Sequence, residues 1–139
     1  MSRSRLVLVQ MALGIAAVLA LSLVPVLHAQ KKGEIRRTVL NKVDLGTVPG
    51  HEGVTTLVEL APGAREEKHT HPGELLGYVQ EGTLMLNVEG KPAATLKAGQ
   101  AFLVPAETIH WGENEGNAPC KVVATFVVPK DKPLASPAK

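Results

Sequence analysis

Residues 75–92 read LLGYVQEGTLMLNVEGKP and contain two short apolar runs, each closed by residues that favour a turn. The first run, residues 75–80, ends at Glu81-Gly82, and the second, residues 83–89, ends at Gly90-Lys91-Pro92. The second run alternates apolar and polar side chains, which is typical of a strand with one buried face. Because Gly and Pro clusters mark the turns between strands, we expect successive short strands in this stretch.

The same pattern recurs on both sides of this stretch, and no part of the chain after residue 30 has the periodicity of a long helix. Many short strands at regular spacing, separated by turn residues, are typical of an all-β sandwich or barrel. We therefore predict one all-β domain over residues 41–129. The further runs that support this prediction are residues 54–60, 94–96, 101–104 and 121–128.

The first residues have the composition of an export signal. Arg3 and Arg5 precede an apolar run over residues 6–27, and the small residue Ala29 follows shortly after. A basic start, an apolar run and a small residue at the cleavage position are typical of a secretory signal peptide. Cleavage after Ala29 would leave 139 − 29 = 110 residues, enough for one domain with one core. We expect an exported protein, either periplasmic or secreted.

An uncleaved membrane anchor is the alternative, because residues 6–27 are long enough to span a bilayer. More positive charge follows this run than precedes it, which does not suit a simple export orientation. We favour the cleaved signal over residues 1–29, and in the alternative the protein would contact the membrane only through this segment. We interpret residues 30–40 as a basic linker and residues 130–139, which contain two prolines and three lysines, as a flexible tail.

Charge and cysteine content narrow the function classes. The chain has 15 basic and 13 acidic residues, and loss of Arg3 and Arg5 with the signal would leave 15 − 2 = 13 basic residues against 13 acidic ones. A neutral domain gives no reason to expect binding to nucleic acid. Cys120 is the only cysteine, so an intramolecular disulfide is excluded, and we expect its thiol to be buried and inert.

Three of the histidines suggest a metal site. His69 and His71 are two residues apart, and in a strand this spacing places both imidazoles on the same face. His110 lies in a later turn-and-strand segment. Neutral imidazole is a common ligand of transition metals, and three protein ligands with open positions describe a catalytic metal site. The alternative is a pair of surface histidines beside a turn, and one His-x-His pair does not exclude it.

The residues around these histidines resemble the two signature motifs of the cupin family. Gly63, five residues, His69-Thr70-His71 and then Gly82 match the first motif, and Gly99, five residues, Pro105, His110, three residues and Asn114 match the second. Sixteen residues separate the two motifs. The resemblance implies a double-stranded β-helix, a jelly-roll barrel with a metal in its mouth, and it implies that His69, His71 and His110 are the ligands.

Two positions depart from the family pattern. The first motif usually has a ligand glutamate seven residues before its closing glycine, where this chain has Leu75, and the nearest carboxylate is Glu74. In a regular strand this shift turns the side chain to the opposite face. Either the preceding Pro-Gly turn still brings Glu74 to the metal, or Leu75 faces a site of three histidines. We favour Glu74 as the fourth ligand and catalytic residue. The second motif often has glycine two residues after its proline, where this chain has Glu107.

Together these features predict one divalent metal ion, which could be Mn, Fe, Ni, Cu or Zn, because all five accept these donors. The resemblance implies a metal-dependent enzyme of oxygenase or lyase type acting on a small carbonyl, enol or carboxylate compound. In that scheme Glu74 is the fourth ligand or a proton acceptor. The alternative is a non-catalytic module that binds or senses a small molecule, and a structural metal site is a weaker third reading.

Two further expectations concern surface residues and assembly. Glu66, Glu67 and Lys68 read as solvated loop charges, and His51 reads as an exposed loop histidine. Small members of the family often pair through strand edges, so the resemblance implies a homodimer.

Overall fold

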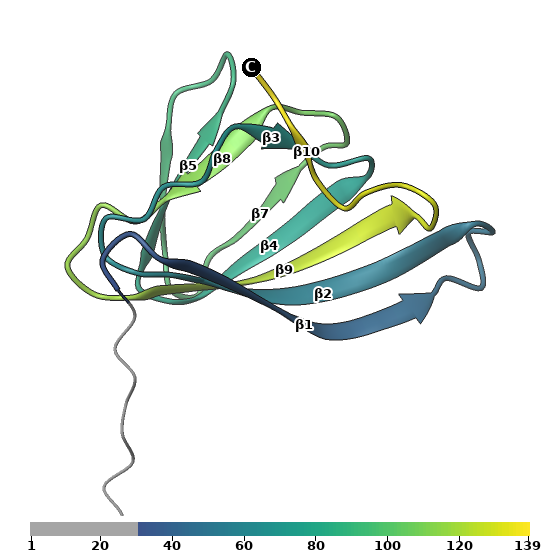
Figure 1. Cartoon of the computed structure of the whole chain (residues 1–139), viewed down its shortest axis with the longest axis horizontal. Coiled ribbons are helices and arrows are strands. Elements are labelled where there is room, and N and C mark those ends of the chain that lie inside the picture. Colours follow the sequence, from purple (N-terminus) through teal and green to yellow (C-terminus); the bar gives the residue numbers. More distant parts are fainter. Residues whose placement is uncertain (1–30) are drawn as a thin grey trace, which may run out of the picture.

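The computed structural model describes residues 31–139, which form two antiparallel β-sheets facing each other (Figure 1). The predicted signal segment, residues 1–29, lies outside the described residues. In the described part, every regular element is a strand, and no helix is long and apolar enough to cross a bilayer. The all-β prediction is confirmed.

Each sheet has five strands, and their order is not the order of the sequence. The first sheet has the order β1 (Ile35–Asp44), β2 (His51–Leu60), β9 (Cys120–Pro129), β4 (Glu74–Glu81) and β7 (Ala101–Val104). The second has the order β10 (Ser136–Pro137), β3 (His69–Thr70), β8 (His110–Glu113), β5 (Thr83–Val88) and β6 (Ala94–Lys97). Strands far apart in the sequence therefore meet in each sheet, which is how the two histidine segments come together.

The core lies between the sheets and is built by side chains of one parity on each strand. In β2 and β9, buried residues alternate with partly exposed ones along the whole strand. The buried apolar residues are Val, Leu, Ala and Phe together with the fully buried Cys120, and the buried polar residues are Glu52, Thr56, His71, His110 and Asn114. Burial raises the pKa of the Cys120 thiol to about 11, and the negative charge of Glu81 adds to this rise, so the thiol is protonated and unreactive, as predicted.

Strand parity in β4 settles which side chains face the barrel interior. Leu75 and Val79 are buried, whereas Glu74, Leu76 and Tyr78 are exposed on the outer face. Between the two buried residues, Gly77 leaves room for the ring of Phe102 on the neighbouring strand, since a Cβ there would lie 2.1 Å from that ring. This parity places Leu75, and not Glu74, in the barrel.

The N-terminal boundary of the domain differs from the prediction. Residues 30–40 were expected to be a linker, but β1 begins at Ile35 and pairs with β2 along its whole length. Within residues 31–139 no strand pairs with the outer edge of β1. Nearly all residues of β1 are exposed, so its sequence lacks the alternation that marks a half-buried strand. The predicted homodimer would use such an edge, and it stays a prediction.

The C-terminal boundary differs as well. Residues 130–139 were expected to form a flexible tail, but β10 pairs with β3, and Leu134 packs against the core. In Figure 1 this segment, drawn in yellow, turns back from the end of β9 and crosses to β3. A proline-rich end with only a two-residue strand has no periodic pattern, so no strand could be predicted there from the sequence.

The turn before β8 keeps a backbone conformation that favours glycine, although Glu107 occupies it. Glu107 has a φ of 58°, the only positive φ of a non-glycine residue in the described chain. Its N–H donates a hydrogen bond to the carbonyl of His71 over 2.8 Å, so the turn ties the two histidine segments together. The left-handed conformation costs a side-chain-bearing residue roughly 1–2 kcal/mol relative to glycine.

The exposed side chain of Glu107 allows a clean test of this strain. We expect Glu107→Gly to raise the free energy of unfolding by about 0.5–1 kcal/mol, because relief of the strain exceeds the extra freedom of glycine in the unfolded chain. Urea denaturation measures the change. Glu107→Ala serves as the control, because it removes the carboxylate but keeps the strain. Equal stability of the two variants would show that the strain is absent.

Candidate metal centre

Three histidines from two segments meet on the inner side of the second sheet. His69 on β3 lies directly across from His110 on β8, and His71 follows β3 by one residue. The ring centroids are 4.4 Å apart for His69 and His110, 4.9 Å for His69 and His71, and 5.0 Å for His71 and His110. One ring nitrogen of each residue lies within 4.8 Å of the others, a spacing that suits one metal ion. The structure thus brings together the three histidines that the sequence singled out.

Hydrogen bonds fix which ring nitrogen of each histidine is free. Nδ1 of His69 lies 2.8 Å from the Glu67 carbonyl, and Nδ1 of His110 lies 2.8 Å from the Thr108 carbonyl. Nδ1 of His71 lies 2.7 Å from the carbonyl of Leu134. Because a carbonyl only accepts, each Nδ1 carries a proton, so in the neutral form of each ring Nε2 has the lone pair. This is the arrangement in which backbone carbonyls orient histidines that bind a metal.

Burial shows that these residues fit a metal ion. Nε2 of His110 is buried and has no hydrogen-bond partner, which leaves an unsatisfied polar atom in the barrel. Burial lowers the pKa of His71 from 6.5 to about 4 and also lowers the pKa of His110, in both cases against the opposing effect of the carbonyl hydrogen bond. Both rings are therefore neutral at pH 7 and have a lone pair available. A cation at the cluster would satisfy the unpaired Nε2.

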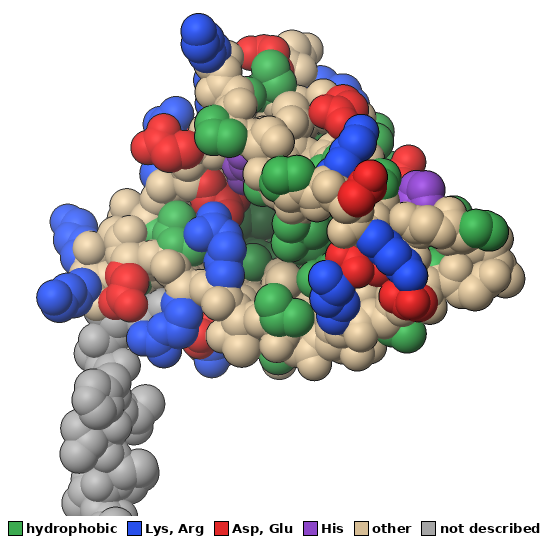
Figure 2. Space-filling view, turned by 45° about the vertical axis from the view of Figure 1, so that its right-hand side comes forward, with side chains coloured by type: hydrophobic (Ala, Val, Ile, Leu, Met, Phe, Trp, Pro, Cys, Tyr) green, Lys and Arg blue, Asp and Glu red, His purple; other side chains and the backbone are tan. Residues whose placement is uncertain are grey.

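The histidines open into a cavity of about 490 Å³ between the two sheets. Its floor is apolar, and Figure 2 shows the hollow with hydrophobic side chains inside it. Leu75 and Phe126 lie in this wall, and the ring of Phe126 meets that of His71 edge-on at 4.6 Å. The other apolar lining residues are Ile35, Val58, Leu60, Leu84, Leu86, Phe102, Val122, Ala124, Leu134, Ala135 and Pro137.

Glu74, predicted to be a metal ligand and catalytic residue, does not lie at the histidine cluster. Glu74 is exposed on the outer face of the first sheet, opposite Val127 in β9, and it does not belong to the cluster of metal-binding groups. The Pro-Gly turn before it does not rotate it inward. Gly73 in this turn lies close to the backbone of Val127, and β4 begins at the next residue, where Glu74 pairs with Val127. Leu75 is the inward residue and gives the site an apolar wall.

The structure places a different carboxylate, that of Glu66, at the cavity. From the sequence we predicted a solvated loop charge at this position. Glu66 is half-buried, with its side chain 15% exposed. One carboxylate oxygen accepts the N–H of Gly112 over 2.9 Å, and the other accepts a hydrogen bond from the guanidinium of Arg37. Gly112 is two residues after His110 on the inner face of β8, so Glu66 lies beside the histidine cluster.

The sequence contained one signal for Glu66. Gly112 is an inward strand position without a side chain, and a Cβ there would lie 3.0 Å from the carboxylate of Glu66. A glycine at such a position often marks a close approach by another group. Arg37 had no such signal, because its role depends on the pairing of β1, which brings its side chain to the cavity.

The remaining singled-out residues do not belong to the cluster. His51 starts β2, and its Nδ1 lies near the Pro49 carbonyl, away from the cavity. Trp111 donates to Glu113, and the cationic groups of Arg65 and Lys68 lie over its ring. Asn114 is buried and donates to the carbonyls of Leu60 and Ala118, so it holds the loop that follows β8.

Comparison with known proteins extends these observations. Germin-like protein 1-1 of Oryza sativa subsp. japonica is 32% identical over 98 residues, which cover 62% of this chain and 45% of that protein. Oxalate oxidase 2 of Hordeum vulgare is 27% identical over 100 residues, which cover 64% of this chain and 45% of that protein. The chain spans about half the length of these curated relatives.

Solved structures share the fold. A protein with a double-stranded β-helix domain from Klebsiella pneumoniae has a TM-score of 0.63 at 22% identity, covering 78% of this chain and 83% of that one. The DMSP lyase DddQ from Ruegeria pomeroyi has a TM-score of 0.56 at 17% identity, covering 62% of this chain and 43% of that one. These likenesses confirm the predicted double-stranded β-helix.

The family model described as a cupin domain matches residues 56–127, just over half of the 139 residues. The match includes both histidine segments and most of the residues that line the cavity, but not β1 or the C-terminal residues 134–137. The protein therefore belongs to the cupin family.

Proposed function

We propose that this protein binds one divalent transition metal through the Nε2 atoms of His69, His71 and His110. The observation that carries the proposal is the shared orientation of the three rings, each with Nδ1 bonded to a backbone carbonyl. The unpaired, buried Nε2 of His110 supports it. Three neutral nitrogen donors suit Fe, Ni, Cu, Zn or Mn, and the donor set does not choose among them.

We propose further that the protein is an enzyme of oxygenase or lyase type. Bound metal with open positions would supply a Lewis acid that polarises an oxygen-bearing substrate. The cavity wall beside it is apolar, so it favours a compound with one polar end and an apolar body. Oxalate, the compound in the name of one relative, has no apolar part to fill a cavity of about 490 Å³.

The charge of a bound divalent ion determines which polar group the ligand should carry. Three neutral histidines leave the two charges of a divalent ion uncompensated, and Leu75 stands where a family carboxylate would offset one of them. Glu66 is already paired with Arg37. An apolar cavity raises the cost of an unbalanced charge, so a ligand that brings a negative oxygen, such as an enolate or a carboxylate, is favoured.

Glu66 takes the role that the sequence assigned to Glu74. It lines the cavity beside the histidines, and two donors hold its carboxylate in one orientation. We assign it as the proton acceptor for a substrate at the cluster, since a general base must be fixed within reach of the proton that it removes.

A non-catalytic binding or sensing module is the second candidate. The observation that favours it is that both oxygens of Glu66 already accept hydrogen bonds, and the other carboxylate lining the cavity, Glu67, is exposed. Such a cavity binds a ligand on the metal without having a free acid or base to transform it.

Metal binding is tested first by removing one donor. We expect wild-type protein to retain close to one transition-metal ion per chain, measured by elemental mass spectrometry. His110→Ala should raise the metal Kd by more than about 100-fold, because loss of a ligand exceeds the 10- to 100-fold effect of losing its outer partner. His51→Ala, outside the cluster, should leave the Kd unchanged. Equal metal content in the two variants would refute the site.

A second test asks what the Leu75 position does. Leu75→Glu places a carboxylate in the cavity, where it should tighten metal binding and make the melting temperature depend more strongly on added metal. Leu75→Gln has the same shape without the charge and should not tighten binding. Glu74→Gln, on the outer face, should leave the metal Kd unchanged. Weaker metal binding by Glu74→Gln would restore Glu74 as a ligand.

Enzyme and sensor are separated by turnover. We expect the metal-loaded protein to convert at least one member of a panel of diketones, phenols and carboxylates, tested with and without oxygen. Glu66→Gln should lower kcat by about 10²- to 10⁴-fold, the usual loss of a general base. Glu67→Gln, its exposed neighbour, is the control and should keep the wild-type rate. Tight binding of one compound without turnover would identify a sensor instead.

A further inference from the structure

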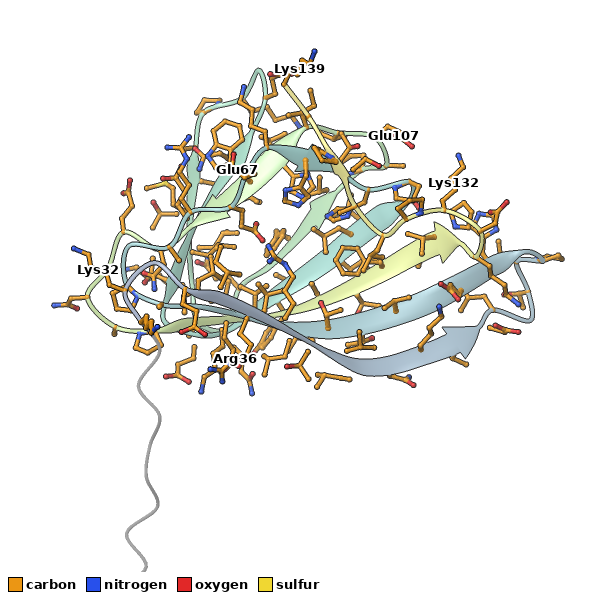
Figure 3. The ribbon with its side chains drawn as sticks, viewed as in Figure 1. Lys32, Arg36, Glu67, Glu107, Lys132 and Lys139 are labelled. Carbon is orange, nitrogen blue, oxygen red and sulfur yellow. The ribbon has the colours of Figure 1, made fainter. Side chains whose placement is uncertain are left out.

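The C-terminal residues 134–138, here called the C-terminal strap, cross the mouth of the cavity. Ser136 pairs with Thr70 and Pro137 with His69, which adds β10 to the edge of the second sheet. The N–H of Ala138 donates to the carbonyl of Lys68 over 2.9 Å. In Figure 3, Lys132 and Lys139 mark the two ends of the segment that passes over the barrel. The strap therefore lies directly against the segment that carries two of the three histidines.

The three histidines differ in where their Nδ1 partner comes from. His69 and His110 each donate to a carbonyl two residues earlier in the chain, so their own segments orient them. His71 donates instead to the carbonyl of Leu134, 63 residues later. Its ring also lies 4.6 Å from that of Phe126 and 4.9 and 5.0 Å from those of His69 and His110, and these are ring contacts that do not distinguish the two ring nitrogens. The orientation of His71 thus depends on the strap.

Leu134 also anchors the strap through its side chain. This side chain is partly buried and packs against the hydrophobic core, and it lines the cavity together with residues 135–137. The strap holds on by few other bonds: the two-residue ladder and the Ala138 hydrogen bond. Burial of the Leu134 side chain therefore contributes much of the free energy that keeps the strap docked and the Leu134 carbonyl at His71.

We propose that the C-terminal strap is a positioning element for His71. The Leu134 carbonyl selects the Nδ1–H tautomer of that ring and turns its Nε2 toward the other two histidines. When the strap detaches from β3, His71 loses the carbonyl that orients it. The cavity loses one of its walls at the same time. By linkage, a metal that binds better with the strap docked also holds the strap in place. The metal part of this inference rests on the proposed function, whereas the tautomer part concerns the metal-free protein alone.

The test weakens the strap at each end without touching a histidine. Leu134→Ala removes the anchoring side chain and keeps the carbonyl, with Leu103→Ala, an exposed leucine on β7, as its control. Ala138→Pro removes the N–H that bonds Lys68, with Ala138→Gly as its control. Circular dichroism and thermal melting establish that each variant is folded, and the two strap variants act at independent bonds.

The decisive readout is nitrogen NMR of the imidazole rings in the metal-free protein. Wild type should show all three rings with Nδ1 protonated. In Leu134→Ala and Ala138→Pro, the signals of His71 alone should move toward a tautomer mixture, while His69 and His110, bonded within their own segments, stay fixed. The metal Kd of both variants should rise about tenfold, the lower range for losing an outer partner of a ligand. The two control variants should match wild type in both measurements.

The outcomes separate the two proposals. If wild type binds no metal but His71 alone moves in the strap variants, the proposed function fails and the positioning role stands. If His71 keeps its tautomer and the metal Kd is unchanged in both strap variants, the positioning role is overturned. It is also overturned if all three rings change together, because the strap would then act on general stability and not on His71.

Discussion

The metal centre depends on one kind of interaction, the hydrogen bond from the Nδ1–H of a histidine to a backbone carbonyl. Three such bonds turn three Nε2 lone pairs toward one another inside an apolar barrel. Without them each ring could present either nitrogen or rotate away, and the spacing of the histidines in the sequence would not define a site. The three carbonyls belong to Glu67, Thr108 and Leu134, each two residues before the start of β3, β8 and β10, so the loops that lead into these strands orient the rings.

Strand parity then sets the chemistry of that site. Because the buried residues of β4 are Leu75, Gly77 and Val79, the carboxylate of Glu74 faces outward and the donor set is three neutral nitrogens. A difference of one position along β4 thus places an apolar side chain where a carboxylate ligand would otherwise lie. Glu66, which lies in another loop, places a carboxylate at the cavity. Its two oxygens already accept hydrogen bonds from Arg37 and from the N–H of Gly112.

Features that depend on the local pattern of residues could be predicted from the sequence. Features that depend on contacts between distant residues could not. The strands, the inward face shared by His69 and His71, and the second-motif histidine follow from alternation and spacing, and the structure has them. Glu74 lies away from the histidines because β4 begins at this residue with its side chain on the exposed face. Arg37 and Leu134 had no signal, since each acts through a pairing partner far away in the chain. Glu107 showed that a family glycine can be replaced while its left-handed φ is kept.

These features together explain why an apolar pocket and a metal centre occur in one small barrel. The inward side chains that form the core also line the cavity. A larger cavity therefore costs packing contacts in the core. The strap offsets this cost, because Leu134 covers the open end while its carbonyl fixes His71. If the strap positions His71 as proposed, a ligand that enters either fits beneath the docked strap or displaces it, and displacement frees His71 from its orienting carbonyl. The proposal therefore couples ligand size to metal affinity through Leu134.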